Sequence, residues 1–169
     1  MTTKTAHVFP QTDTDDTTAR PDATSADVGQ ALRIGVDGSI DTIDLTRAQD
    51  GSHGTAICEA IGCRRYTITD VDAQTDMWID DEGMPDLGDV EMVTATLNPL
   101  ATLLLAEHRE IYQPYFGVAL FTGRDGERTT GLDAAHVMRL RTAAEAIASR
   151  PAHLEAFRQR VIAAVTRRA

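Results

Sequence analysis

The chain has 169 residues, of which 42% are hydrophobic, 5% aromatic and 25% charged, and its formal net charge is -10 at pH 7. This length suits one domain with a tail, and the negative charge argues against direct binding of DNA because phosphates would be repelled over most of the surface. The low aromatic content also argues against a stacking platform for single-stranded nucleic acid.

The charge is divided unequally along the chain. Asp and Glu outnumber Lys and Arg by 19 to 6 in residues 1–100, whereas Lys and Arg outnumber Asp and Glu by 10 to 7 in the remainder. An acidic front half attracts basic surfaces. We therefore expect a protein partner that carries a basic surface.

The cellular compartment is suggested by the cysteines and by the apolar runs. Cys58 and Cys63 are too few for a disulfide framework, and no segment near the N-terminus resembles a signal peptide. The longest apolar run, residues 97–106, is far shorter than the ~20 residues that span a bilayer. These features predict a cytoplasmic protein that does not cross a membrane.

Residues 1–29 are rich in Thr and Asp and hold few large apolar side chains. Such a segment buries too little apolar surface to offset the entropy of ordering it, so we predict a disordered acidic tail. The alternative is a short linear motif around Val8-Phe9-Pro10 that folds on a partner.

The elements that follow the tail begin with a hairpin. Apolar residues alternate from Ala31 to Val36, Asp37-Gly38 supplies a turn, and a second strand follows at 40–45. Apolar spacing predicts a helix over 53–61, and Gly62 is a typical left-handed residue at its end.

The middle of the chain gives signals of unequal strength. Residues 65–71 and 77–79 read as two strands, whereas residues 91–96 are ambiguous between a strand and an extended loop. Asn98 is placed to cap a helix over 100–109, and Pro99 suits its first position because proline lacks the N–H that would be unpaired there.

The last third predicts a strand pair and two helices. A strand at 115–122 turns at Asp125-Gly126 and pairs with residues 128–131. Asp133 caps a helix that runs to Arg150, where Pro151 ends it. The final helix, from residue 152, carries an apolar stripe of Leu154, Phe157, Val161 and Val165.

Together these elements predict an α+β fold in which a mostly antiparallel sheet packs against two or three helices, with a C-terminal helical pair and a disordered N-terminal tail. We divide the chain into the tail (1–29), the α+β domain (30–150) and a C-terminal amphipathic helix (151–169). The stripe of that helix either covers the sheet or forms the seam of a homodimer.

The densest group of candidate binding residues lies in the segment 80–91. A calcium loop fits this segment poorly, because Pro85 occupies the sixth position, where such loops need glycine for a sharp turn. We therefore predict no metal site and assign the carboxylates to a protein-binding surface. They are Asp80, Asp81, Glu82, Asp86, Asp89 and Glu91.

Several residues resemble a family of small proteins of unknown function found in bacteriophages, plasmids and their bacterial hosts. The resemblance covers about residues 31–140 and is carried by Trp78, Asp81-Glu82-Gly83, Asn98-Pro99-Leu100-Ala101-Thr102, Tyr115, Gly117, Gly123 and Leu132. It implies an accessory protein of a mobile element and carries over no catalytic residue.

The leading hypothesis is a non-enzymatic accessory protein whose carboxylates bind a basic host or element protein, standing in for the phosphates of a nucleic acid. No nucleophile elbow, Walker loop or dinucleotide motif is present, so we predict no catalytic residue and no cofactor.

Two alternatives remain open. One is a nucleotide-binding protein or hydrolase with a pocket between the loop before Asn98 and the strand at Tyr115, in which arginines hold phosphate. Its candidate residues are Arg64, Arg65, Arg109 and Arg124. The other is a regulator or a homodimeric structural module that uses the last helix.

Overall fold

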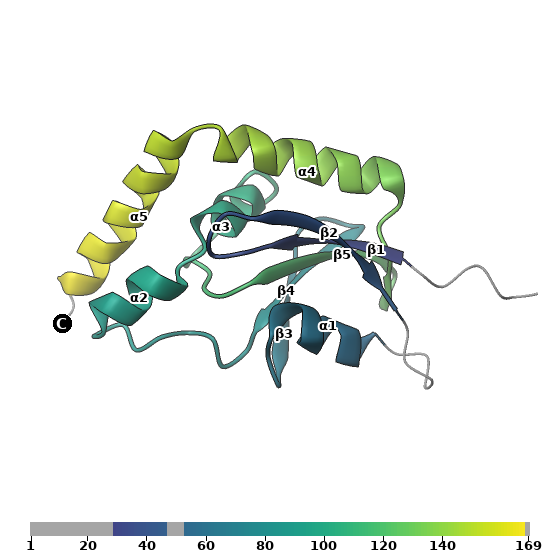
Figure 1. Cartoon of the computed structure of the whole chain (residues 1–169), viewed down its shortest axis with the longest axis horizontal. Coiled ribbons are helices and arrows are strands. Elements are labelled where there is room, and N and C mark those ends of the chain that lie inside the picture. Colours follow the sequence, from purple (N-terminus) through teal and green to yellow (C-terminus); the bar gives the residue numbers. More distant parts are fainter. Residues whose placement is uncertain (1–28, 47–52, 168–169) are drawn as a thin grey trace, which may run out of the picture.

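The computed structural model describes residues 29–46 and 53–167. Within these ranges six strands form one antiparallel sheet in the order β2-β1-β5-β4-β3, with the short β6 paired to β5. Figure 1 shows helices on both sides of this sheet, which confirms the α+β prediction. The strands are β1 (Gly29–Ile34), β2 (Ile40–Leu45), β3 (Tyr66–Asp70), β4 (Thr75–Asp80), β5 (Ala119–Asp125) and β6 (Arg128–Thr130).

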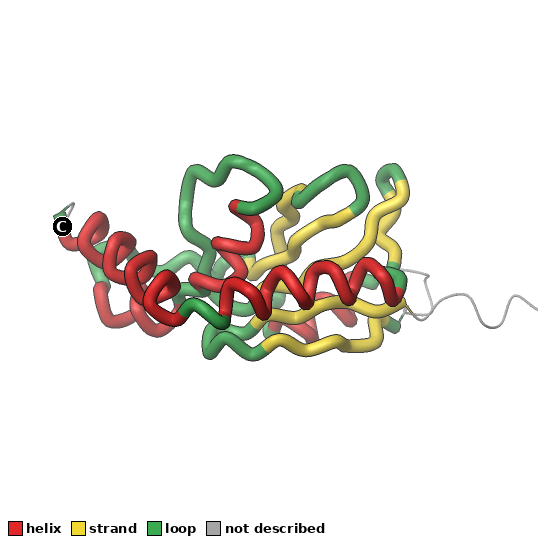
Figure 2. Tube along the Cα trace, turned by 90° about the horizontal axis from the view of Figure 1, so that it is seen from above, coloured by secondary structure: helices red, strands yellow, loops and turns green. Residues whose placement is uncertain are grey.

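The helices of the described residues fall into two groups. α1 lies against β4 and β5 on one face, whereas α4 contacts β1 and β2 and packs on α3 on the other (Figure 1). Seen from above in Figure 2, α4 runs over the strands and α5 continues beyond them toward α2. The helices are α1 (Gly54–Ile61), α2 (Val90–Thr96), α3 (Pro99–Ala106), α4 (Ala134–Ala148) and α5 (Pro151–Thr166).

The alternation of side chains along the strands divides the core between the two faces. Met77 of β4 and Phe121 of β5 join the cluster beneath α3 and α4, whereas Trp78 and Leu120 join the cluster beneath α1. Neighbouring residues of one strand thus point to opposite faces, as a strand requires. Both faces of the central strands are buried, and the sheet is the common wall of two cores.

A third, smaller apolar cluster lies beyond the sheet. Val93 of α2, Leu97, Phe116 and Val165 of α5 form its buried part. Phe157 and Val161 pack against it and remain half-buried, whereas Leu154 packs on the main core instead. The stripe of the last helix therefore packs within its own domain, along α2 and α3.

The segment 91–96 is a correction to the sequence analysis, because it belongs to the helix α2 and not to a strand or an extended loop. Asp89 caps this helix by accepting a hydrogen bond from Met92 N. The hydroxyls of Thr94 and Thr96 donate to main-chain carbonyls four residues earlier, at 2.7 Å in each case. Threonines that suggest a strand thus satisfy their hydroxyls within a helix.

Further boundaries differ from the predicted ones. The helix predicted over 100–109 ends at Ala106, and the strand predicted at 77–79 extends over Thr75–Asp80. Most of the predicted tail lies outside the described residues, but Gly29 pairs with Leu45 and begins β1. The strand predicted at 115–122 starts only at Ala119, because Gly117 has a φ of 75°, which breaks an extended chain. Phe116 forms only an isolated bridge with Leu97.

Asn98 joins elements that are distant in sequence. Its Oδ1 accepts from Ala101 N at the start of α3, which confirms the predicted cap. Its Nδ2 donates to Ile34 O at 3.1 Å and to Gly117 O at 2.9 Å, and the residue is 1% exposed. One buried amide therefore connects the end of β1, the approach to β5 and the start of α3.

Replacing this amide tests its role in stability. Asn98→Ala is expected to lower the free energy of unfolding by about 2–4 kcal/mol, because a cap is lost and the carbonyls of Ile34, which is buried, and Gly117, which is half-buried, lose their donor. Asn98→Ser keeps a capping oxygen and should recover about 1 kcal/mol of that loss. Urea unfolding of the three proteins measures both values, and equal stability of the alanine variant and the parent would contradict this role.

Candidate functional site

The six predicted acidic residues are brought together where β4 ends. Asp80 closes that strand and is half-buried, Glu91 lies in the first turn of α2, and the others occupy the connection between them. All but Asp80 are exposed to solvent. The segment 80–91, here called the acidic loop, therefore presents its charge to the outside.

Main-chain hydrogen bonds shape the acidic loop. The Oδ1 atoms of Asp80, Asp86 and Asp89 accept from the N–H groups of residues 82, 88 and 92, at 3.0, 2.9 and 3.0 Å. These side chains stabilise two turns and a helix start, as Asp commonly does. An asparagine at each position retains an acceptor oxygen, so charge can be removed without removing these bonds.

Two of the arginines proposed for phosphate lie beside the acidic loop. Arg64 Nη2 is 3.3 Å from Glu82 Oε2, and Arg65 Nη2 is 3.5 Å from Asp81 Oδ2. All four side chains are at least 42% exposed. Solvent-exposed pairs of this kind contribute about 0–1 kcal/mol, so they do little to fix the loop.

The other two arginines lie at the opposite end of β3. Arg109 Nη1 donates to Asp70 O at 2.8 Å, and Arg124 forms an ion pair with the Asp70 carboxylate. Asp70 and Arg65 are separated by the length of β3, about 15 Å. The four arginines therefore lie in two separate pairs and do not converge on one phosphate.

A polar cluster surrounds the turn between β3 and β4. Asp76 is 5% exposed, and its Oδ1 has no hydrogen-bond partner, although Arg124 Nη1 lies 3.2 Å away. Burial raises the pKa of Asp76, an effect that the Arg124 guanidinium offsets only in part. The charged form of this carboxyl is therefore less favourable in the folded protein than in water.

The neighbouring carboxyl Asp72 behaves in the opposite way. Burial acts to raise its pKa, but hydrogen bonds from Gln74 N, at 2.8 Å, and from the Thr75 hydroxyl outweigh that effect, and nearby histidines add to it. The pKa of Asp72 therefore lies below its usual value. His108 Nδ1 is 3.8 Å from Asp72 Oδ2.

The same cluster borders a small cavity of about 240 Å³ between the turn and α4. Thr75 Oγ1 lies 2.9 Å from His136 Nε2, but the Thr75 hydroxyl proton is donated to Asp72, so this is not the pairing of a nucleophile with a base. Both groups are buried, Thr75 at 0% and His136 at 9% exposure, so the hydroxyl is closed to a substrate. Within the described ranges no three His, Cys, Asp or Glu side chains converge as metal ligands.

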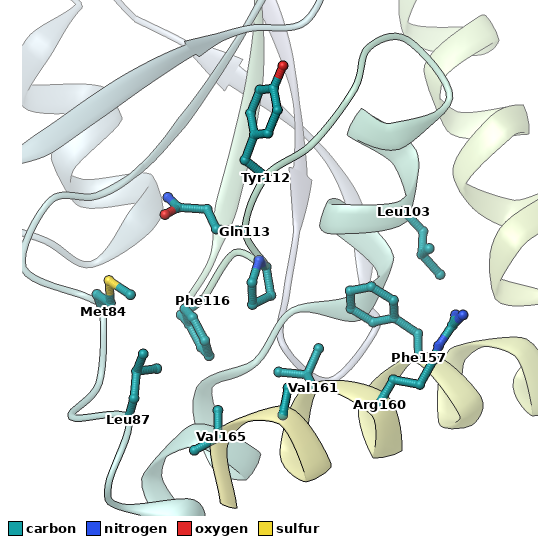
Figure 3. A pocket seen from close by; sticks show the side chains of 12 residues that line it. Met84, Leu87, Leu103, Tyr112, Gln113, Phe116, Phe157, Arg160, Val161 and Val165 are labelled. Atoms are coloured by element: carbon teal, nitrogen blue, oxygen red, sulfur yellow. The ribbon is translucent and has the colours of Figure 1, made fainter. Parts of the chain in front are cut away.

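A larger cavity, of about 630 Å³, opens beside the acidic loop. Figure 3 shows Met84 and Leu87 on one side, residues of α5 on the other and Phe116 between them. Sites for small ligands have about 300–1,000 Å³, so this cavity is large enough to hold several side chains. Its lining is Met84, Leu87, Leu103, Tyr112, Gln113, Pro114, Phe116, Phe157, Arg160, Val161, Ala164 and Val165.

A smaller depression of about 180 Å³ continues this cavity toward the end of β4. The two share Met84, Gln113, Pro114 and Phe116, and the smaller one also includes Asp80 and Asp81. We call the combined feature the groove. Its wide part is apolar, and its narrow end carries carboxylates.

The groove adjoins Tyr115, where the nucleotide hypothesis places one side of a pocket, but none of residues 88–98 lines it. Its chemistry differs from the nucleotide hypothesis, because the lining of the wide part is mainly apolar and its one arginine, Arg160, is not among the four that were proposed. The combination of an apolar wide part with an acidic narrow end is not among the features predicted from the sequence. Met84 and Leu87, two apolar residues within an acidic loop, were the signal that pointed to it.

Comparison of the chain with protein-family models, with curated proteins and with solved structures finds no match. The resemblance to phage and plasmid proteins therefore stays a prediction, and any function has to follow from the chemistry of the site. In the part of the chain that the structure describes, no helix has both the length and the apolar character needed to cross a bilayer.

Two substitutions in the polar cluster should have opposite effects at neutral pH. Asp76→Asn is expected to raise the free energy of unfolding at pH 7, because the raised folded-state pKa makes the charged form unfavourable, while Arg124 keeps its pair with Asp70. Asp72→Asn is expected to lower the free energy of unfolding, because a depressed pKa reports a stabilised charge.

Both differences should shrink on acidification. The gain from Asp76→Asn disappears as the pH falls through the raised pKa toward the unfolded value of about 3.9, and the loss from Asp72→Asn disappears as the pH falls below about 3.9 and through the depressed pKa. Urea unfolding at a series of pH values between 7 and the acid limit of folding measures these slopes. If both substitutions changed the free energy of unfolding in the same direction, the pKa values of Asp76 and Asp72 would not be shifted in opposite directions.

Proposed function

We propose that this chain is a non-enzymatic binding protein that recognises a basic protein through the acidic loop and the groove beside it. The observation that supports this most directly is the juxtaposition of five exposed carboxylates with an open apolar cavity. Carboxylates attract and orient a basic partner, and an apolar cavity supplies contact area that excludes water. The partner's own function decides whether the carboxylates imitate phosphates.

The exposed apolar residues at the groove favour a protein partner over a nucleotide. Tyr112 is 86% exposed and Met84 is 54% exposed. Tyrosine and methionine are enriched in protein interfaces, and the flexible methionine side chain adapts to different partners. A nucleotide would instead need cations directed into the cavity, and Arg160 is the single cation in its lining.

The biological setting that we propose is that of an accessory protein of a bacteriophage or plasmid. This setting rests on the resemblance over residues 31–140 and on the acidic character of the chain, whose net charge is -10. A small acidic protein of such an element suits the capture of a basic host or element protein within the cytoplasm. The homodimeric alternative has less support, because the stripe of α5 packs against α2 and the core beneath α3 and α4.

Affinity capture from a host lysate at low salt tests the proposal. The tagged protein is compared with a variant in which Asn or Gln replaces all six residues of the acidic loop, which retains the acceptor oxygens that shape the loop. We expect a basic protein to be retained by the parent, lost from the variant and released by raised salt.

A matched control separates the location of charge from its amount. The control variant neutralises six exposed carboxylates outside the acidic loop and the groove: Asp44, Glu59, Glu107, Asp125, Glu127 and Glu145. It has the same net charge as the first variant and should still capture the partner. Equal loss in both variants, or retention that is independent of salt, would contradict recognition by the acidic loop.

A further inference from the structure

The groove has two chemically different ends, and this polarity restricts what it can bind. Phe116 and the α5 residues Val161 and Val165 line its wide part, whereas Asp80 and Asp81 lie at its narrow end. Met84 borders both parts. A ligand that fills the groove therefore contacts apolar side chains at one end and carboxylates at the other.

We propose that the groove binds a linear peptide segment of the partner, with bulky apolar side chains in the wide part and an arginine or lysine at the end near Asp80 and Asp81. This inference rests on the proposed function and specifies the ligand of the same site. Burial of large apolar side chains supplies affinity, and the carboxylates select the basic residue beside them.

Charge also fixes the direction in which the segment lies. Arg160 borders the wide part from α5, on the side opposite Met84 (Figure 3), and it would repel a second cation placed there. Asp81 and Asp80 attract a cation only at the narrow end. Of two segments that carry the basic residues before or after the apolar pair, the one whose side chains reach both ends in a single chain direction should therefore bind better.

The residues around the groove leave it accessible to such a segment. Met84 and Tyr112 are 54% and 86% exposed, so no other described residue covers them, although the Tyr112 hydroxyl donates to Glu110 Oε2 at 3.4 Å. Asp81 contacts Arg65 at 3.5 Å, with 42% of its side chain exposed, and a pair of this kind exchanges readily with an incoming arginine.

Synthetic fluorescent peptides test this inference with the intact protein. In a Gly/Ser background, one peptide carries a Phe-Leu pair followed by two arginines, a second has the arginines before the pair, a third has glutamates for the arginines, and a fourth has serines for the pair. Fluorescence anisotropy at low and high salt measures binding. We expect one of the two arginine orders to bind at least tenfold more tightly than the other three peptides.

Matched variants assign the two halves of the ligand to the two ends of the groove. Met84→Ser should weaken the preferred peptide at least fivefold with little change in salt dependence, whereas Asp80→Asn with Asp81→Asn should remove the salt dependence and the preference for one order. Both sites are on the surface or keep their main-chain bonds, so thermal unfolding is expected to stay close to that of the parent.

Charge exchange gives the most specific check. Asp81→Arg is expected to reject the arginine peptide and to accept the glutamate peptide, which structural damage would not produce. Equal affinity for all four peptides, or binding of the protein only to a second copy of itself, would overturn the inference. Suppose capture of the lysate partner is lost in the acidic-loop variant but unchanged by Met84→Ser. The groove would then be overturned as the peptide site, and only the acidic-loop part of the proposed function would stand. Capture that is unchanged in both variants would reject both parts.

Discussion

The buried amide of Asn98 is the constraint on which the arrangement of this domain depends. It donates to Ile34 O at the end of β1 and to Gly117 O before β5, while its own oxygen caps α3. Its main-chain N–H donates to Tyr115 O at 2.9 Å. A side chain that is 1% exposed has no water to replace these partners, so the three segments keep one relative position.

That position places the chain at 113–116 and thereby creates one wall of the groove. α5 forms the opposite wall, and it is attached near its two ends: Leu154 packs on the main core, and Val165 is buried against α2. Between these attachments Arg158 Nη1 donates to Thr94 O at 3.3 Å, and Phe157 and Val161 stay half-buried. The groove is thus the space between a helix held at both ends and a loop positioned by Asn98.

Local signals in the sequence were sufficient for much of the fold. The hairpin of β1 and β2, the left-handed Gly62 after α1 and the caps at Asn98 and Asp133 all depend on residues close to one another in the chain. α2 was missed because its threonines bond to carbonyls inside the helix, a possibility that strand propensity does not register. The start of β5 was missed because a single left-handed glycine interrupts an otherwise strand-like run.

The candidate site was less predictable because it is built from long-range contacts. The acidic loop is continuous in sequence, and its exposure followed from its composition. The groove, however, combines residues 84–87, 103–116 and 157–165, which meet only through tertiary packing. The relative positions of the candidate arginines also depend on tertiary packing. Arg65 and Arg124 lie toward opposite ends of the sheet edge formed by β3.

The uneven charge of the chain places acidic and basic residues on different sides of the groove. The acidic loop comes from the front half and α5 from the arginine-rich back half, yet the groove separates them and Arg158 of α5 bonds to a main-chain carbonyl. Ion pairs between the carboxylates of the acidic loop and the arginines of α5 would close the groove and remove the charge difference between its ends. Arg64 and Arg65 form ion pairs with the acidic loop, and their side chains are 88% and 70% exposed. Such exposed pairs are weak. A basic residue of a bound peptide, whose apolar neighbours are buried in the groove, can therefore displace them.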